Sequence, residues 1–551
     1  MLCIAPSALA APSAPPNFEV EPAVTGLVAP VAVAWAPDGR MFIAEKSGVV
    51  KVNRGGVTSQ VIDLSDRVNG SGERGMLGIA VDRDFASNGH VYVLYLAEAD
   101  PAAPDGDGET VSRLSRITVN PDDTVQDSGP GQDPLTHVVG AWTPPARDPL
   151  TCPDPPPADL DCIPAPIIFH AIGTVRVDPA DGTLWVGSGD SAAVYTRPYD
   201  VNSFAGKILH VGTDGRGLPG HPFCPLETDR TKACTKVYAK GFRNPFRFTL
   251  RGGGKGPVVG DVGARKVDEI DLIEPGVDYG WPCYEGSLRS PFEIRQECID
   301  QYALEGTSEE PTGPSLESPL DPQTGGALIG GPLLDTPNYP AAYRGRVYFG
   351  DWARGWLRSA PVDGNHFTAP AEDFVTDAGF PVDIQVGPDG NLTYVDIAAG
   401  TVYRITYHAP DPAPDNPQQG DGPGSGDNPG ASLPGERGGP APNPTPTALR
   451  PLQLGVSGGR IRVRRDWSVR LKATNPNGEA WTGSATLSRR VGLASHRFAV
   501  PPGAQGAVVL KLNATGRKAL RRRRRLAVIV SFKPRDGQAA RRRVVLLAPR
   551  G

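Results

Sequence analysis

The sequence predicts an all-β protein, in which a six-bladed β-propeller is followed by a small Ig-like β-sandwich. The chain of 551 residues contains 67 Gly and 59 Pro, so turns are frequent and helical patterns are scarce. Its length exceeds that of one ordinary domain. Short strands rich in β-branched and aromatic residues alternate with Asp-Gly and Gly turns, a pattern typical of hairpins.

One unit, a turn followed by strand segments, recurs along the first 407 residues. Its copies lie at 37–52, 88–96, 179–190, 256–273, 345–364 and 387–407. Six divergent copies of such a unit predict six blades around one axis. We therefore expect the propeller to occupy residues 17–407.

Composition changes after the propeller. Residues 408–450 are rich in Pro, Gly, Asn and Asp, which predicts a disordered linker. Residues 451–551 alternate with period two over several short strands, which predicts the β-sandwich. This last segment carries 23 Lys or Arg and three acids, whereas the rest of the chain carries 33 and 58. We expect its basic surface to bind an anionic cell-wall polymer or glycan rather than nucleic acid, because its Arg runs lack interleaved aromatic residues.

The N-terminus and the cysteines indicate export. Residues 1–16 are apolar and small and contain an A-x-A pattern at residues 8–10, which predicts the remnant of a signal peptide. Six of the seven cysteines form close sequence pairs, and we expect three disulfides: Cys152–Cys162, Cys224–Cys234 and Cys283–Cys298. No run of about 18 apolar residues occurs elsewhere. These features predict a secreted, extracellular protein, held at the cell surface without a membrane span.

Residues 238–286 contain the densest group of special residues. An Arg-Asn-Pro triplet begins one strand at Arg243 and Asn244, and a Gly-Asp-Val-Gly turn ends at Gly263. Turn carbonyls and the carboxylates that follow them suit Ca²⁺. The planar groups of Arg243 and Asn244 suit a ligand rich in carbonyl or carboxylate oxygens. A surface ion pair for Arg243 and a turn cap for Asn244 are the alternatives.

His170 follows an apolar strand end and precedes Ala-Ile-Gly-Thr, so we expect it where a strand meets a loop. Imidazole titrates near neutral pH, which suits a general base. A partly buried histidine with a purely structural role explains the same residue, and the residues alone favour that interpretation.

Four segments together resemble the glucose/sorbosone dehydrogenase family, the soluble quinoprotein sugar dehydrogenases. Besides residues 238–286 they are RGMLGIAVDRDF (74–85), HAIGTVRVDPADGTLWVGSGD (170–190) and FAGKILHV (204–211), and they occur in the family's order. The resemblance covers residues 20–407. The whole chain resembles secreted actinobacterial members of the family that have an extra C-terminal β-domain. It implies oxidation of an aldose-type sugar at C1 to the lactone, with pyrroloquinoline quinone (PQQ) and Ca²⁺ as cofactors and an external electron acceptor.

The resemblance also assigns roles to individual residues. It implies that His170 is the general base beside the cofactor and that Arg243 stabilises negative charge on the reduced cofactor. The other residues that it places at the cofactor are Asn244 and Glu73. Backbone carbonyls of Gly263 and Ala264 are implied ligands of the Ca²⁺ that touches PQQ, and Glu269 and Tyr279 of a second, structural Ca²⁺.

The chain departs from the family's pattern in two places. The family's Arg-x-Arg-Asp motif clamps the PQQ carboxylates, but residues 380–384 here read Phe-Pro-Val-Asp-Ile and keep only Asp383. Phe169 stands where sugar-oxidising members often have a polar residue. The cations that we considered as replacements are Lys240, Arg265, Lys266 and Arg354. Two alternative functions therefore stay open: a non-catalytic, Ca²⁺-stabilised propeller that binds carbohydrate or protein, and a Ca²⁺-dependent hydrolase of the lactonase type.

Overall fold

The computed structural model divides the chain into two compact units, residues 1–305 with 309–409 and residues 306–308 with 410–551. In the first unit it describes residues 11–98, 105–106, 108–127, 132–142, 152–192, 196–305, 309–321 and 323–409. In the second it describes residues 306–307, 410, 453–455, 460–464, 467–474, 481–487, 496–500, 505–512, 514–523, 525–534 and 540–548. Most of the expected signal peptide and linker lies outside these residues.

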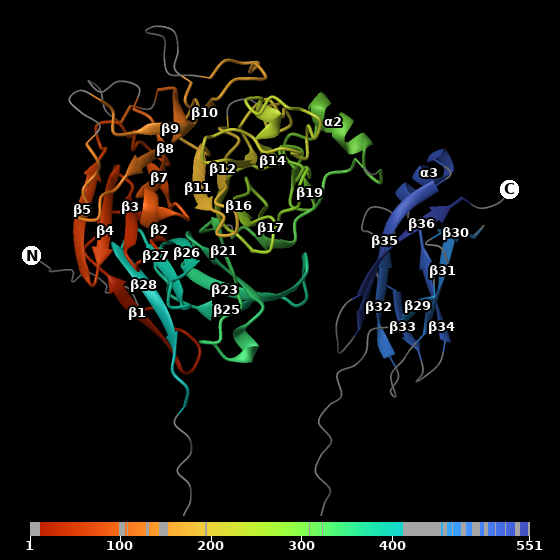
Figure 1. Ribbon diagram of the computed structural model, residues 1–551. Coiled ribbons are helices and arrows are strands. Elements are labelled where there is room, and N and C mark those ends of the chain that lie inside the picture. The colour runs from red at the N-terminus through yellow and green to blue at the C-terminus, as the bar shows by residue number, and fades with distance from the viewer. Residues whose placement is uncertain are drawn as a thin grey trace, which may run out of the picture. The chain divides into compact units, whose positions relative to one another are not determined.

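Six antiparallel sheets form the blades of the first unit (Figure 1). Blade 1 consists of β2 (Pro30–Trp35), β3 (Met41–Glu45), β4 (Val49–Arg54) and β5 (Val57–Asp63). Blade 2 consists of β6 (Met76–Val81), β7 (His90–Leu96), β8 (Thr110–Thr118), β9 (Thr136–Val139) and β10 (Ile163–Ala165), with helix α1 (Phe85–Asn88) between β6 and β7. Blade 3 consists of β11 (Ile172–Val177), β12 (Leu184–Ser188), β13 (Lys207–Val211) and β14 (Val237–Lys240).

The remaining blades continue this order and close the ring. Blade 4 consists of β15 (Pro245–Thr249), β16 (Val258–Asp261), β17 (Val267–Leu272) and β20 (Leu316–Pro319). Blade 5 consists of β21 (Leu328–Leu334), β22 (Arg346–Asp351), β23 (Trp356–Asp363), β24 (His366–Phe367) and β25 (Glu372–Val375). Blade 6 consists of β26 (Pro381–Val386), β27 (Leu392–Asp396), β28 (Thr401–Tyr407) and β1 (Phe18–Val24). Because β1 comes from the N-terminus and pairs with β28, the two ends of the propeller sequence close the circle in one sheet.

Each of the six repeats found in the sequence falls in a different blade, so the predicted blade number is confirmed. Apolar side chains between neighbouring blades form the core. Phe42 and Val50 of blade 1, for example, belong to the same buried cluster as Ile79 and Val93 of blade 2. Burial of such side chains between sheets is the main stabilising term of the fold.

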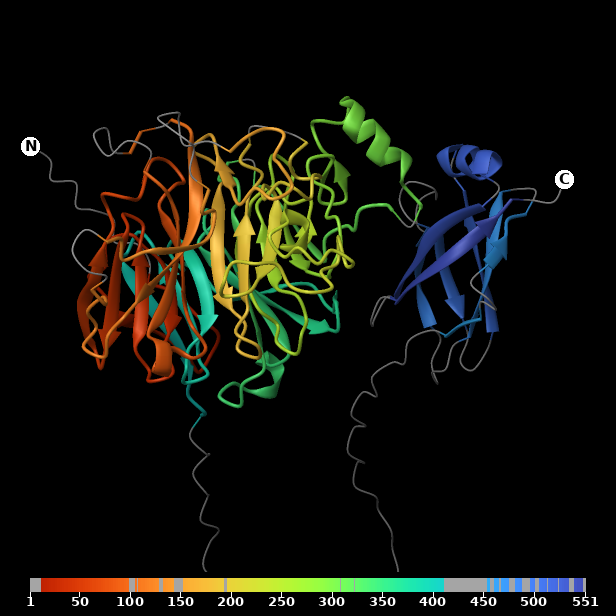
Figure 2. The same ribbon diagram turned by 45° about the horizontal axis from the view of Figure 1, so that its top comes forward.

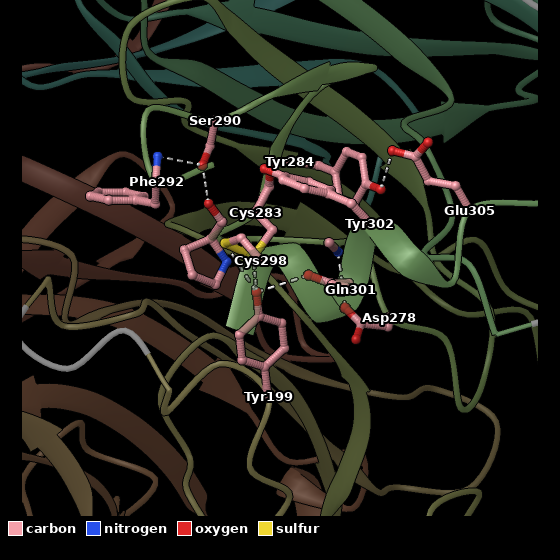
Figure 3. The surroundings of a disulfide bond; sticks show 12 residues. Tyr199, Asp278, Cys283, Tyr284, Ser290, Phe292, Cys298, Gln301, Tyr302 and Glu305 are labelled. Atoms are coloured by element: carbon pink, nitrogen blue, oxygen red, sulfur yellow. Dashed lines mark hydrogen bonds between the residues drawn. A yellow bond between two sulfur atoms is a disulfide. The ribbon is translucent and has the colours of Figure 1, made fainter. Parts of the chain in front are cut away.

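All three expected disulfides are present. Cys283–Cys298 ties the hairpin β18 (Tyr284–Glu285) and β19 (Leu288–Arg289) to α2 (Gln296–Ala303). Figure 3 shows this bond between Tyr199, whose hydroxyl donates to Gln301 Oε1 at 2.8 Å, and Tyr302, whose hydroxyl donates to the Cys283 carbonyl at 2.6 Å. The bond and these hydroxyls hold this helical insert between β17 and β20 of blade 4.

The second unit contains two sheets. One consists of β29 (Gln453–Gly455), β31 (Ser468–Thr474) and β34 (Gln505–Lys511). The other consists of β30 (Arg460–Arg462), β36 (Ala540–Leu547), β35 (Arg525–Pro534), β32 (Trp481–Leu487) and β33 (His496–Val500).

The sequence predicted a sandwich of antiparallel strands for the second unit, and two details differ from that prediction. The pair β30–β36 is parallel, so the sandwich is not purely antiparallel. The start of the Arg run at 521–525 belongs to helix α3 (Ala514–Arg523), because Arg, Lys and Ala are good helix formers. Among the described residues, no helix has both the length and the apolar character needed to cross a membrane.

Candidate functional site

The residues assigned by sequence gather on one face of the propeller. The innermost strand of each blade begins at this face, which we call the site face. Glu73 precedes β6, His170 precedes β11, and Arg243 with Asn244 precedes β15. In Figure 2, α2 and the long loops of blades 2 and 3 lie at the upper end of the unit, where β11 begins. The face therefore offers loop residues on a rigid scaffold, as many binding sites do.

His170 is held in one orientation by Asp190. Its Nδ1 lies 2.9 Å from Asp190 Oδ1, and its side chain is 13% exposed. The other carboxylate oxygen accepts a bond from Trp281 Nε1 at 2.6 Å. Because a carboxylate only accepts, Nδ1 carries a proton, and in the neutral ring Nε2 then has the lone pair. This is the arrangement that a general base requires.

The backbone around this pair is strained. His170, Ser191 and Ala192 have φ values of 50°, 53° and 47°, which non-glycine residues seldom adopt. The Ser191 amide donates to the His170 carbonyl at 2.9 Å. Strain of this kind persists only where the surroundings fix it, and it is concentrated at functional sites.

Glu73 approaches the same histidine. Its Oε2 accepts a bond from the His170 backbone amide at 3.1 Å, and its own amide donates to the Ile168 carbonyl. Glu73 is exposed, so its carboxylate is available to a ligand at the site face.

Arg243 and Asn244 are anchored through their backbone by Asp261. The Asp261 carboxylate accepts both amides, from Arg243 at 3.0 Å and from Asn244 at 2.6 Å. Burial raises the pKa of Asp261 to about 7. The Arg243 guanidinium lies over the Trp281 ring at 5.6 Å, so blades 3 and 4 meet at the Trp281 side chain.

The turn at 262–267 presents its carbonyls because carboxylates take its amides. Glu285 Oε1 accepts bonds from the amides of Ala264 at 2.9 Å, Arg265 at 2.6 Å and Lys266 at 2.5 Å. Asp268 Oδ1 accepts the Gly263 amide at 2.8 Å. Arg243 Nη1 then lies 2.7 Å from the Val262 carbonyl and 2.6 Å from that of Gly263. A positive group thus already occupies the carbonyl side of this turn.

Three buried carboxylates share one side of blade 4. Asp261 pairs with Glu269 in the ladder, and Asp271 follows two residues later on the same side of β17. Neither Asp271 oxygen has a hydrogen-bond partner. Burial and mutual repulsion raise the pKa of both Glu269 and Asp271 well above the ordinary range. This side of the blade therefore requires protons or a cation for neutrality.

Glu269 and Tyr279 have separate contacts. The Glu269 carboxylate accepts the Gly286 amide, while the Tyr279 ring stacks on Phe242 at 4.9 Å. Their joint role as Ca²⁺ ligands stays a prediction. Within the described ranges no group of three or more His, Cys, Asp or Glu side chains is arranged to hold a metal ion.

The propeller axis is occupied by cations that the fold itself uses. Arg247 is completely buried and donates to the carbonyls of Val382 at 2.5 Å, Gly173 at 2.5 Å and Val31 at 2.8 Å. Arg176 Nη2 pairs with Asp383 Oδ1 at 2.6 Å. We call Arg176, Arg247 and Asp383 the axial cluster. Asp383, the retained residue of the missing clamp motif, therefore neutralises an arginine of the axis.

The cations considered as replacements for the clamp are mostly engaged. Lys240 pairs with Asp278 at 2.5 Å, Arg354 pairs with Asp351, and Lys266 Nζ donates to the Arg289 carbonyl at 2.6 Å. Arg265 is exposed. None of these contacts places a cation in the role of the absent arginines.

Two aromatic side chains are exposed on the site face. Phe169, next to His170, is 44% exposed, and Trp352, after β22, is 42% exposed. Trp352 contacts Phe380 with ring centroids 5.6 Å apart. Exposed aromatic rings offer flat apolar surface to a ligand.

The sequence did not reveal four residues that hold other site residues in place by hydrogen bonds. They are Asp190, Trp281, Asp261 and Glu285. Asp190 ends the Gly-Ser-Gly-Asp motif, and a Cβ at Gly189 would overlap the His170 backbone. That close approach of two strands was the available signal. Glu285 gave no signal, because its partners are amides 18 to 21 residues earlier in the chain.

A family profile matches most of the propeller. The profile of the Glucose / Sorbosone dehydrogenase family covers residues 27–128 and 168–404. The HIPL1 protein of Arabidopsis thaliana is 27% identical over 284 residues, 45% of this chain and 40% of that protein. Quinoprotein glucose dehydrogenase B of Acinetobacter calcoaceticus is 25% identical over 281 residues, 49% of this chain and 53% of that protein. The chain thus spans about half the length of these relatives.

Other relatives are matched along nearly their whole length. Aldose sugar dehydrogenase YliI of Escherichia coli is 22% identical over 412 residues, 74% of this chain and 96% of that protein. The PQQ-bound aldose sugar dehydrogenase of Streptomyces coelicolor has a TM-score of 0.51 at 19% identity, covering 72% of this chain and all of that one. A Thermus structure described as a putative glucose dehydrogenase has the same TM-score at 24% identity, covering 70% and 99%. These structures show the common propeller fold.

Proposed function

The chain belongs to the glucose/sorbosone dehydrogenase family, and we propose that it is a secreted quinoprotein that oxidises an aldose-type sugar at C1 to the lactone. The proposal includes PQQ and Ca²⁺ as cofactors and an external electron acceptor. The relatives named as quinoprotein or aldose sugar dehydrogenases support it.

The single observation that carries the proposal is the His170–Asp190 pair. Asp190 fixes the proton on Nδ1, so Nε2 can take the proton of the sugar's anomeric hydroxyl. The carboxylate then faces the imidazolium that forms and stabilises its charge. A purely structural histidine would not need the Trp281 bond to orient its partner.

Arg243 and the 262–264 turn would hold the cofactor end of the site. When bound, PQQ supplies the acceptor for the hydride of the sugar carbon. The chemistry of the donor set suits a cation, because Glu285 and Asp268 take the turn amides and a cation, the Arg243 guanidinium, binds the Val262 and Gly263 carbonyls. Ca²⁺ at the Gly263 and Ala264 carbonyls would act as a Lewis acid, and it would replace the bond that Arg243 makes to Gly263.

Ca²⁺ is also supported by the carboxylates behind this turn. Both Asp271 oxygens are buried without a partner, and Glu269 lies on the same side of the strand. A divalent cation would offset this buried negative charge. We propose Glu269 and the Tyr279 carbonyl as its ligands.

The residues fit PQQ at its quinone end and not at its carboxylates. Arg243 and Asn244 supply planar donors, but Lys240 and Arg354 are paired with Asp278 and Asp351. Charge-assisted bonds contribute about 1.5–3 kcal/mol each, so loss of the clamp predicts weaker binding of PQQ than in members that keep it. This departure favours the alternative of a non-catalytic propeller for carbohydrate or protein.

Export is supported by the three disulfides, which persist in oxidising compartments. Phe169 and Trp352 would contact the apolar face of a sugar ring beside His170. An apolar wall at Phe169 favours sugars with fewer polar groups on that side.

The proposal is tested by dye reduction across a panel of aldoses, with PQQ and Ca²⁺ added to the purified chain. We expect dye reduction that requires PQQ. Sugar binding without dye reduction would establish the non-catalytic propeller. Lactone hydrolysis without any acceptor would establish the hydrolase. His170→Ala separates these cases, because it removes oxidation and leaves simple sugar binding intact.

A further inference from the structure

The exposed side chains that the structure describes on helix α3 of the second unit are all cations. The exposed side chains of Arg517, Lys518, Arg521 and Arg522 line an open hollow of about 650 Å³. Leu520 is completely buried and fixes which side of the helix is turned to solvent. We call these four side chains the α3 basic face.

The like charges of the α3 basic face destabilise helix α3. Arg517 and Arg521, and likewise Lys518 and Arg522, are four residues apart, so like charges lie one above the other. The helix, from Ala514 to Arg523, contains no acidic residue that would relieve this repulsion. A helix selected only for stability would alternate the signs of its charges. The arrangement is explained if an external anion supplies the missing negative charge.

The surroundings of the face narrow the class of ligand. The Arg521 guanidinium lies over the Trp467 ring at 4.8 Å, which fixes the cation and covers an aromatic face that a nucleic-acid base would use. The large apolar side chains that are exposed among the described residues all belong to the first unit. The apolar side chains of the second unit whose burial the structure describes, among them Leu510, Leu512 and Leu520, are buried or half-buried and form no wedge for a lipid bilayer.

We propose that the α3 basic face binds a linear polymer that carries closely spaced phosphate groups. Four residues of helix advance about 6 Å, so the two rows of cations can contact successive anionic groups of one extended chain. Arg guanidinium binds phosphate through two parallel hydrogen bonds, and the adjacent Lys518 adds a point charge. This function is independent of sugar oxidation, because the cations lie in the second unit.

The experiment measures binding of long-chain inorganic polyphosphate to the full chain at several salt concentrations. Release of counterions by about four phosphate contacts predicts a slope of log K against log salt near −3, or roughly 50-fold weaker binding from 50 to 200 mM salt. The variant R517A/R522A should bind at least 10-fold more weakly, with a slope shallower by roughly 1 to 2. Its unfolding temperature and dye reduction should equal those of the parent chain.

A matched control removes two exposed cations from the propeller, Arg216 and Lys255. The variant R216A/K255A should keep both affinity and slope. Equal binding by R517A/R522A and the parent would overturn the proposal. So would tighter binding to single-stranded DNA or to anionic phospholipid vesicles than to polyphosphate, because the ligand class would then be different.

Discussion

The axial cluster and the site face use the same kinds of residue in opposite ways. At the axis, arginines take backbone carbonyls from three blades, and Asp383 neutralises Arg176. At the site face, carboxylates take backbone amides, Arg243 donates to the Val262 and Gly263 carbonyls, and Asp190 holds the His170 ring through Nδ1. The charged groups of the axis therefore bind within the fold, whereas the site face keeps His170 Nε2 and the exposed Glu73 carboxylate for a ligand.

This difference separates charged residues that stabilise the fold from charged residues that shape a binding site. A buried charge whose partners all belong to the backbone of the fold holds strands together. A carboxylate that accepts bonds from several amides of one turn fixes that turn in the shape that a ligand requires. Four changes to the protein or its conditions test this contrast.

The first prediction concerns His170. His170→Ala should lower the rate of dye reduction by about 10²–10⁴-fold, because the general base is lost. Asp190→Asn should also lower it, because an amide at this position allows the wrong tautomer. Both variants should unfold within a few degrees of the parent protein. A rate within threefold of the parent for His170→Ala would show that this histidine is structural.

The second prediction concerns the axis. Arg247→Met should lower the free energy of unfolding by roughly 3–5 kcal/mol, because three buried carbonyls lose their donor. Denaturation in urea measures the change. The exposed Arg54→Ala is the control, and it should change stability by less than about 1 kcal/mol. A change below about 1 kcal/mol for Arg247→Met would show that the bonds of Arg247 do not stabilise the propeller.

The third prediction concerns the acid stability of blade 3, which contains His210 in β13 and His221 in the loop between β13 and β14. Burial lowers the pKa of both His210 and His221 to about 4. Their folded pKa is below the unfolded value of 6.5, so their contribution is present above pH 6.5 and is lost as the pH falls toward 4. Each contributes at most about 3 kcal/mol. Stability measured between pH 7 and 4 should fall steeply, and His221→Gln should flatten the curve. An unchanged curve would contradict the assignment.

The fourth prediction concerns the turn at the site face. Glu285→Gln keeps the shape of the side chain and removes its charge, so its bonds to the turn amides weaken. We expect Ca²⁺ affinity to fall about tenfold, or about 1.4 kcal/mol, in a calorimetric titration. The exposed Glu227→Gln should leave the affinity unchanged. Equal affinities of both variants and the parent would place the Ca²⁺ elsewhere.

The sequence was sufficient for the blades and not for the contacts that close them. The six Asp-Gly or Gly repeats each mark a hairpin, since local turn chemistry determines them. The pairing of β1 with β28 joins residues almost 400 positions apart, and no local pattern encodes it. Helix α3 was missed because a run of arginines is compatible with either a helix or a strand edge.

The candidate site shows the same limit. His170, Arg243 and Asn244 could be found because they begin strands within recognisable motifs. Glu285 and Arg247 could not, because each acts on backbone atoms of distant segments, and backbone partners leave no trace in composition. Arg247, for instance, bonds to a carbonyl 216 residues away.

The most direct test of the account is a calorimetric titration of PQQ into the Ca²⁺-loaded chain, beside the same titration of Arg243→Ala. The account predicts binding in the micromolar range that is weakened at least tenfold in Arg243→Ala and after removal of Ca²⁺. Absence of binding at tens of micromolar PQQ, or equal binding by Arg243→Ala, would contradict the claim that the site face holds a quinone cofactor.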